Sequence, residues 1–243
     1  MSSSTFHRIA LLVAGVSLLT AVSCSMNQTI VIRADGSGTG SLKVEVSPVL
    51  RDYFINLAEL SGNTSAVDSG QIFDLKEVKK SFESRPGITV TRTAIPTKTS
   101  MEVDISYKSI KTLFTDDSLA GTGVATYTES AGTKTLKFHL DKDNFTKLAV
   151  VFPVLSDPLF AGMGPQPNEK MTEDEYLKMI EYSLGADGAA QLAKSFIIIT
   201  MKPEGQIVSQ SGVTLSDGSV VFKIPLIKVL VLNTPLDYSF SWK

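Results

Sequence analysis

The chain has 243 residues, enough for one large domain or two small ones. It carries 23 Lys and Arg against 25 Asp and Glu, and its formal net charge of −2 excludes the basic surface that nucleic-acid binding requires. One Cys rules out an intramolecular disulfide and a multi-cysteine metal site, and two His leave little material for a His-based site. A composition of 43% hydrophobic and 20% charged residues is typical of a folded protein.

The first 24 residues have the organisation of a bacterial lipoprotein signal. Residues 1–8 are polar and carry one basic side chain, Arg8. Residues 9–22 form an apolar run that is too short to span a bilayer comfortably, which takes roughly 20 residues. We therefore predict that residues 1–23 are a signal peptide and that Cys24 is the lipidated first residue of the mature protein. An ordinary secretory signal cleaved nearby and an uncleaved anchor are the alternatives.

The residues around the cysteine bear on location. Ala21 stands three places before Cys24, where Leu is usual, and such relaxed boxes resemble those of spirochaete lipoproteins. A multiply acylated Cys24 would hold the protein on a membrane, because each buried CH₂ contributes about 0.8 kcal/mol. Ser25, in place of Asp, implies outer-membrane sorting by similarity to enterobacterial lipoproteins. The expected location is the bacterial cell envelope, anchored to a membrane, with the outer membrane favoured and the side left open.

The mature chain, residues 24–243, predicts strand pairs separated by helices. Alternating apolar and polar residues predict hairpins that join residues 29–33 to 42–46, 88–95 to 101–107, and 124–128 to 134–140. Helical spacing and capping residues predict helices at 48–60, 75–82, 110–114, 142–152, 172–184 and 188–194. From residue 196 onward only strands are predicted: a fully buried one at 196–201, its partner at 206–211, and others at 220–224, 225–232 and 238–242. This order favours a single α+β ectodomain, with helices packed on an antiparallel sheet built from hairpins.

No combination of catalytic residues stands out. His139 lies between Phe138 and Leu140, which the alternation assigns to the core, so His139 is predicted to face solvent. No Ser is surrounded by the G-x-S-x-G pattern of a nucleophile elbow. The glycine-rich residues 35–40 lack Gly-Lys-Ser/Thr and join two strands, so they form a turn rather than a phosphate loop.

Metal sites find equally little support. Residues 141–145 begin like a calcium loop, but Phe145 stands where an oxygen ligand is needed, and helix capping explains Asp141 better. Asp116 and Asp117 are most simply a solvated turn. We expect no catalytic residue, no metal and no cofactor, and a function other than catalysis.

An apolar loop is the strongest candidate for ligand contact. Residues 153–170 are rich in Gly and Pro yet carry several large apolar side chains, and loops of this length often serve as lids or binding loops. One interpretation is that these side chains fill the core. The other is that they cover a cavity for an acyl chain or another apolar ligand. The candidate ligand-binding residues are Leu155, Leu159, Phe160 and Met163.

The C-terminal third resembles mycobacterial lipoproteins of the LppM type. It has a buried strand at 197–201, then Pro203-Glu204-Gly205-Gln206-Ile207-Val208, a Ser-Asp-Gly turn, a strand at 220–225, a second apolar stretch and a terminal aromatic strand. The early hairpin at Ala34-Asp35-Gly36-Ser37-Gly38 fits the same family. The resemblance implies an α+β envelope domain with lipid or glycolipid contact, and it transfers no catalytic residue.

Three functions remain open from the sequence. The first is a non-enzymatic, lipid-anchored envelope lipoprotein that meets the membrane through Cys24 and binds an envelope or host protein or an apolar or lipid ligand. The second is a surface-exposed adhesin or antigen that binds host macromolecules. The third is a carboxylate-dependent hydrolase, although no acid pair among the 25 acidic residues can be named. Nucleic acid is not an expected partner.

Overall fold

The three hairpins predicted from alternation are all present. The computed structural model describes residues 24–60, 70–115, 117–150, 163–166 and 170–243. The first hairpin joins β1 (Ser25–Ile32) to β2 (Gly38–Glu45), the second β3 (Ile88–Thr97) to β4 (Ser100–Tyr107), and the third β5 (Ala125–Ser130) to β6 (Thr133–Leu140). The later strands are β7 (Phe196–Pro203), β8 (Ile207–Ser211), β9 (Thr214–Ser216), β10 (Ser219–Pro225) and β11 (Leu236–Trp242).

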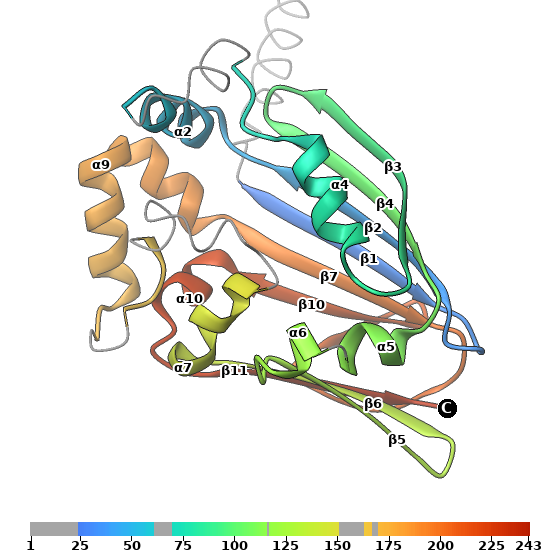
Figure 1. Cartoon of the computed structure of the whole chain (residues 1–243). Helices are drawn as coiled ribbons and strands as arrows, with labels where there is room; N and C mark the ends of the chain where they lie inside the picture. Colours follow the sequence, from blue (N-terminus) through green and yellow to red (C-terminus); the bar gives the residue numbers. More distant parts are fainter. Residues whose placement is uncertain (1–23, 61–69, 116, 151–162, 167–169) are drawn as a thin grey trace, which may run out of the picture.

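These strands form two sheets that face each other (Figure 1). One has seven strands in the order β3-β4-β2-β1-β7-β10-β9, and the other has four in the order β5-β6-β11-β8. Neighbouring strands are antiparallel except β1 and β7, which run parallel from the same end of the sheet. Helices pack against both sheets, so the predicted α+β class is confirmed.

Four helices, α2 (Pro48–Leu60), α4 (Leu75–Glu83), α7 (Lys142–Phe145) and α9 (Glu173–Ala193), begin where their capping residues predicted. The described residues also form α5 (Ile110–Thr115), α6 (Asp117–Ala120), the 3₁₀ turn η1 (Thr146–Val150) and α10 (Leu226–Val231). At the start of α9, Thr172 Oγ1 accepts a hydrogen bond from the Glu175 N–H, and the Glu175 carboxylate accepts one from the Thr172 N–H. Gly185, with φ 73°, interrupts α9 where the sequence predicted a helix end.

Two predictions for the tail are wrong. β8 does not pair with β7, because β1 and β10 already occupy both edges of β7. Instead β8 pairs with β11 in the other sheet, and reciprocal hydrogen bonds between Gln206 and Lys243 continue that pairing. Residues 226–231 form helix α10 rather than a strand, because Ile227 and Val231, four residues apart, are buried together against α9.

The sequence predicted that β7 would be fully buried, and this prediction is wrong. β7 has a neighbouring strand on each side, but most of its side chains are only half-buried. Residues 196–200 are only half-buried, and Met201 is the first fully covered side chain. One face of the strand meets the core, whereas on the other face Ile198 lies between the exposed Asn27 and Lys223 of the neighbouring strands. The apolar run at residues 196–201 therefore correctly indicates a strand inside the sheet, but only one face of that strand is covered by the core.

Two clusters of buried side chains form the core. The larger lies between the sheets and includes Phe222, Phe240 and Trp242, with the rings of the last two stacked at 5.0 Å. The smaller joins α9 to α10 through Tyr176, Ile180, Leu192, Ile227 and Val231. In Figure 1, α2, α9 and α10 gather at the end of the sheets where β1 and β7 begin.

Candidate apolar ligand site

A cavity of about 130 Å³ lies between the two sheets. Strand alternation builds it, because residues two apart on one strand point to the same face. In the smaller sheet Phe138 is paired with Tyr238 and Leu140 with Leu236, and these four side chains form one wall. The remaining lining comes from Val124 and from β7 and β10, through Ile199, Phe222 and Ile224. Every lining side chain is therefore aliphatic or aromatic.

The aromatic side chains define the shape of the cavity. The Phe222 ring meets those of Phe138 and Tyr238 edge-on, at centroid distances of 5.3 and 5.7 Å. Burial raises the pKa of Tyr238, so its hydroxyl stays neutral and adds no charge to the wall. Apolar cavities of about 150 Å³ remain dry and bind a benzene-sized molecule. This cavity can therefore hold one ring or the end of an acyl chain, whereas a polar head group would have to remain outside.

The cavity lies in the half of the molecule where β1 and β7 begin. Ile224 is opposite Ile197, the second residue of β7, and Phe222 is opposite Ile199, the fourth. At the same end, Ser25 is opposite Phe196, and Cys24 directly precedes Ser25. Topology thus places the predicted lipid-attachment residue and the cavity at one end of the sheets.

Cys24 is buried at the junction of β1 and α2. Its Sγ accepts a hydrogen bond from the Ser47 N–H at 3.2 Å, and Ser47 is itself fully buried. The Ser47 hydroxyl then accepts from the Leu50 N–H at 3.3 Å, in the first turn of α2. Cys24 is therefore packed against the folded domain rather than joined to it by a spacer.

Of the four ligand-binding residues predicted from the sequence, Leu155, Leu159 and Phe160 lie outside the described residues. Met163 is described, and it does not line the inter-sheet cavity. It packs against the smaller core cluster, where its carbonyl accepts a hydrogen bond of 2.6 Å from the Tyr176 hydroxyl. Burial raises the pKa of Tyr176 to about 12, so this hydroxyl remains a donor at neutral pH.

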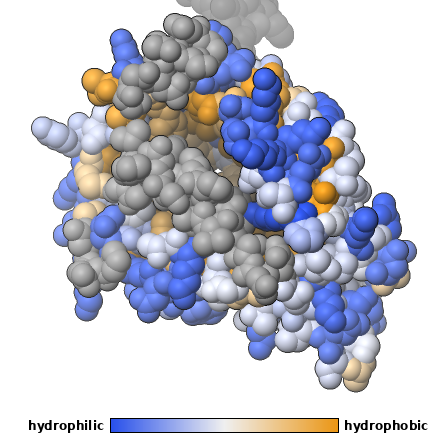
Figure 2. Space-filling view, in the orientation of Figure 1, coloured by the Kyte–Doolittle hydropathy of each residue, from blue (hydrophilic) through white to orange (hydrophobic). Residues whose placement is uncertain are grey.

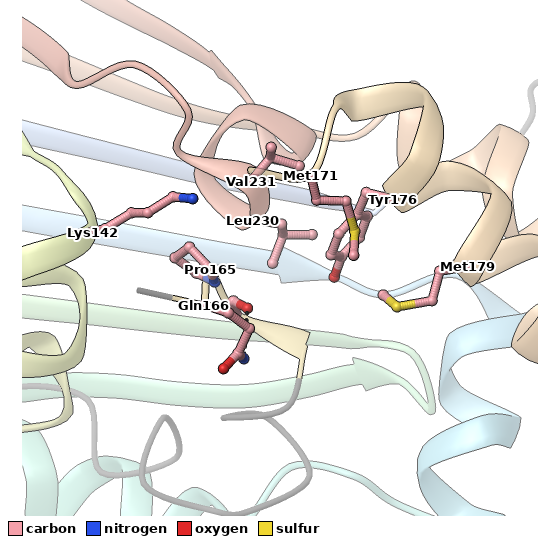
Figure 3. A pocket seen from close by; sticks show the side chains of 9 residues that line it. Lys142, Pro165, Gln166, Met171, Tyr176, Met179, Leu230 and Val231 are labelled. Carbon is pink, nitrogen blue, oxygen red and sulfur yellow. Dashed lines mark hydrogen bonds between the residues drawn. The ribbon is translucent and has the colours of Figure 1, made fainter. Parts of the chain in front are cut away.

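A second, smaller pocket adjoins this cluster. Figure 3 shows Tyr176, Met171 and Leu230 close together, with Lys142 reaching in from the opposite side. Its volume is about 40 Å³, room for only one or two water molecules. It is therefore a weaker candidate for an apolar ligand than the cavity between the sheets.

His139 has carboxylate partners that the sequence analysis did not identify. Its Nδ1 lies 2.7 Å from the Asp237 carboxylate, and its Nε2 lies 2.9 Å from that of Asp141. The hydrogen bond to Asp237, and to a smaller degree the one to Asp141, raises the pKa of His139. The hydrogen bond from the Asn144 N–H, and to a smaller degree the one from His139, lowers the pKa of Asp141. Both ring nitrogens are engaged, so neither is available in this arrangement as a general base. The sequence did hold a signal for this pair. His139 in β6 and Asp237 in β11 are each flanked by core-facing residues, so both side chains point to the outer face of the same sheet.

The described residues contain no cluster of three or more His, Cys, Asp or Glu side chains that could hold a metal ion. Within the same residues, no helix is both long enough and apolar enough to cross a membrane.

Comparison with known proteins gives one structural likeness. No family model matches the chain, and no curated protein matches it in sequence. The chain is similar to the folded domain of Mycobacterium tuberculosis LppM, solved by NMR, with a TM-score of 0.44 and 11% sequence identity over 91% of this chain and 90% of that one. The likeness to the LppM type is thus distant. It assigns no ligand or residue to this chain, and it does not bear on a spirochaete origin.

Proposed function

We propose that the mature protein is a lipid-anchored lipoprotein of the bacterial cell envelope that acts by binding rather than catalysis. Its ligand is an apolar group, such as the end of an acyl chain, held in the cavity between the two sheets. The observation that carries this proposal is the cavity itself, about 130 Å³ with eight aliphatic or aromatic residues around it. The signal-like residues 1–23 and the position of Cys24 support the anchor.

The lining favours an apolar occupant. The cavity is partly open, and most of its lining side chains are half-buried. A hydrocarbon group that fills it removes apolar surface from water on both sides, which contributes roughly 25 cal/mol per Å². The uniformly apolar lining therefore selects hydrocarbon over polar groups.

Native mass spectrometry of residues 25–243, expressed without the lipid and gently desalted, tests the ligand. The wild type should carry a reproducible added mass of lipid size. Ile224→Phe, which adds bulk to the cavity wall, should lose this mass. Val208→Phe adds the same ring type at an exposed position and should retain it. A bare wild-type mass, or an adduct kept by both variants, would contradict the proposal and favour a scaffold or adhesin.

The anchor has an independent test. Full-length protein should fractionate with membranes, and Cys24→Ala should release it, because the cysteine sulfur is the attachment point for lipid. Mass spectrometry of the wild type should show acyl chains on Cys24. A Cys24→Ala protein that still pellets with membranes would refute the anchor without affecting the cavity.

A further inference from the structure

The proposed anchor is attached to the fold without a spacer. β1 begins at Ser25, and Cys24 is buried against Ser47, as described above. Cys24 is buried as a free thiol, so acyl chains on its sulfur require the side chain to turn away from Ser47, and they would then begin directly beside the folded domain. Because there is no flexible linker to span a gap, the end of the molecule that contains Cys24 must lie close to the membrane. This step rests on the lipidation proposed for Cys24.

Among the described residues, the most exposed large apolar side chains lie on helices at that same end. Tyr182 of α9 is 95% exposed and Leu60 of α2 is 84% exposed, whereas Val31, Val208 and Leu215, on strands, are at most 50% exposed. α2 packs against α9, and both lie where β1 and β7 begin (Figure 1). Figure 2 shows separate patches of hydrophobic colour beside hydrophilic ones in the upper part of the view, where Figure 1 places α2. Exposed tyrosine is typical of membrane interfaces, because its ring is apolar and its hydroxyl remains wet.

The charges on α9 indicate which lipids this surface would accept. Lys178 is the one basic residue of α9, and it is outnumbered by the exposed acidic residues Glu173, Asp174, Glu175, Glu181 and Asp187, so the helix has no excess of positive charge. Docking would therefore depend on apolar insertion rather than on attraction to anionic head groups. Zwitterionic phospholipid is sufficient for a surface of this kind.

We propose that the end of the molecule formed by α2 and α9 docks on the phospholipid leaflet that holds the Cys24 anchor, with Leu60 and Tyr182 in the head-group region. The inter-sheet cavity lies in the same half of the molecule, so docking brings it near the leaflet. An apolar ligand could then pass from the membrane without crossing a wide layer of water. The partner of this surface is the lipid bilayer itself.

Site-directed spin labelling of the lipidated protein tests the docking. The chain has one cysteine, and lipidation blocks it, so Tyr182→Cys supplies a single reactive thiol for a nitroxide. Thr128→Cys, exposed on β5 near the hairpin tip at Ser130, is the matched control at the other end of the sheets. The proteins are expressed with their signal, purified and placed in phosphatidylcholine vesicles.

The label at position 182 should collide several-fold less often with a water-soluble nickel complex, and more often with oxygen, than the label at 128. High salt should not change this difference. Without any substitution, amide hydrogen exchange of residues 48–60 and 176–186 should be slower on vesicles than in detergent, whereas that of residues 125–140 should not change. A protein that floats with the vesicles but shows equal collision rates at both positions and no slowing of exchange would overturn the docking alone. A protein that does not float would overturn the anchor, and the docking with it.

Discussion

Val124→Ile tests whether the inter-sheet cavity has room for an added group. Val124 lines the cavity, and its backbone is held on both sides. Its N–H donates to Thr122 Oγ1 at 3.1 Å, and its carbonyl accepts from the His139 N–H at 2.9 Å. The substitution adds one methylene to the wall, and burying a methylene stabilises a protein by about 0.8 kcal/mol. For a chain of this size, the melting temperature should rise by roughly 2–3 °C.

Urea denaturation followed by tryptophan fluorescence measures the effect. Trp242 is the only tryptophan, and it is 1% exposed against the Phe240 ring, so its emission reports loss of the core. Val103→Ile is the control, because Val103 is fully buried in β4, whereas Val124 is half-buried, and Val103 does not line the cavity. Overpacking should destabilise that variant by about 1–3 kcal/mol. If Val124→Ile destabilises the protein as Val103→Ile does, the cavity wall has no free space and the reasoning fails.

Three further predictions concern parts of the fold outside the cavity lining. Gly38→Ala should destabilise by about 1–3 kcal/mol or more, because a Cβ there would overlap the Val31 carbonyl oxygen and the Tyr107 ring; an unchanged urea midpoint would contradict this. Thr172→Ala should lower the free energy of unfolding by about 1 kcal/mol through loss of the α9 cap, measured by a thermal melt. Thr172→Ser, which retains the hydroxyl, is the control. His139→Gln should reduce stability most at low pH. Because the two carboxylates raise the His139 pKa, the stability that His139 contributes is complete below about pH 6.5 and is lost as the pH rises through its folded-state pKa. A difference in unfolding free energy between wild type and variant that widens as the pH rises would refute the pairing.

The sequence by itself determined the local structure of this protein. Asp74 caps α4 by accepting from the Lys76 and Glu77 N–H groups, as its position before an amphipathic stretch predicted. The three hairpins follow from alternation across short turns, and Gly185 interrupts α9 as predicted. These features depend on residues a few positions apart, which interact in the same way whatever the rest of the chain does.

Only the tertiary structure decided which elements meet. Alternation assigned Phe138 and Leu140 to a core face, but the pairing of β6 with β11 brings Tyr238 opposite Phe138 to form the cavity wall. The same pairing brings together His139 and Asp237, 98 residues apart. β8 lies on β11 because both edges of β7 are occupied, a competition among strands that no local pattern records. The cavity exists because two sheets, each specified locally, meet without filling the space between them, and that fit depends on the whole fold.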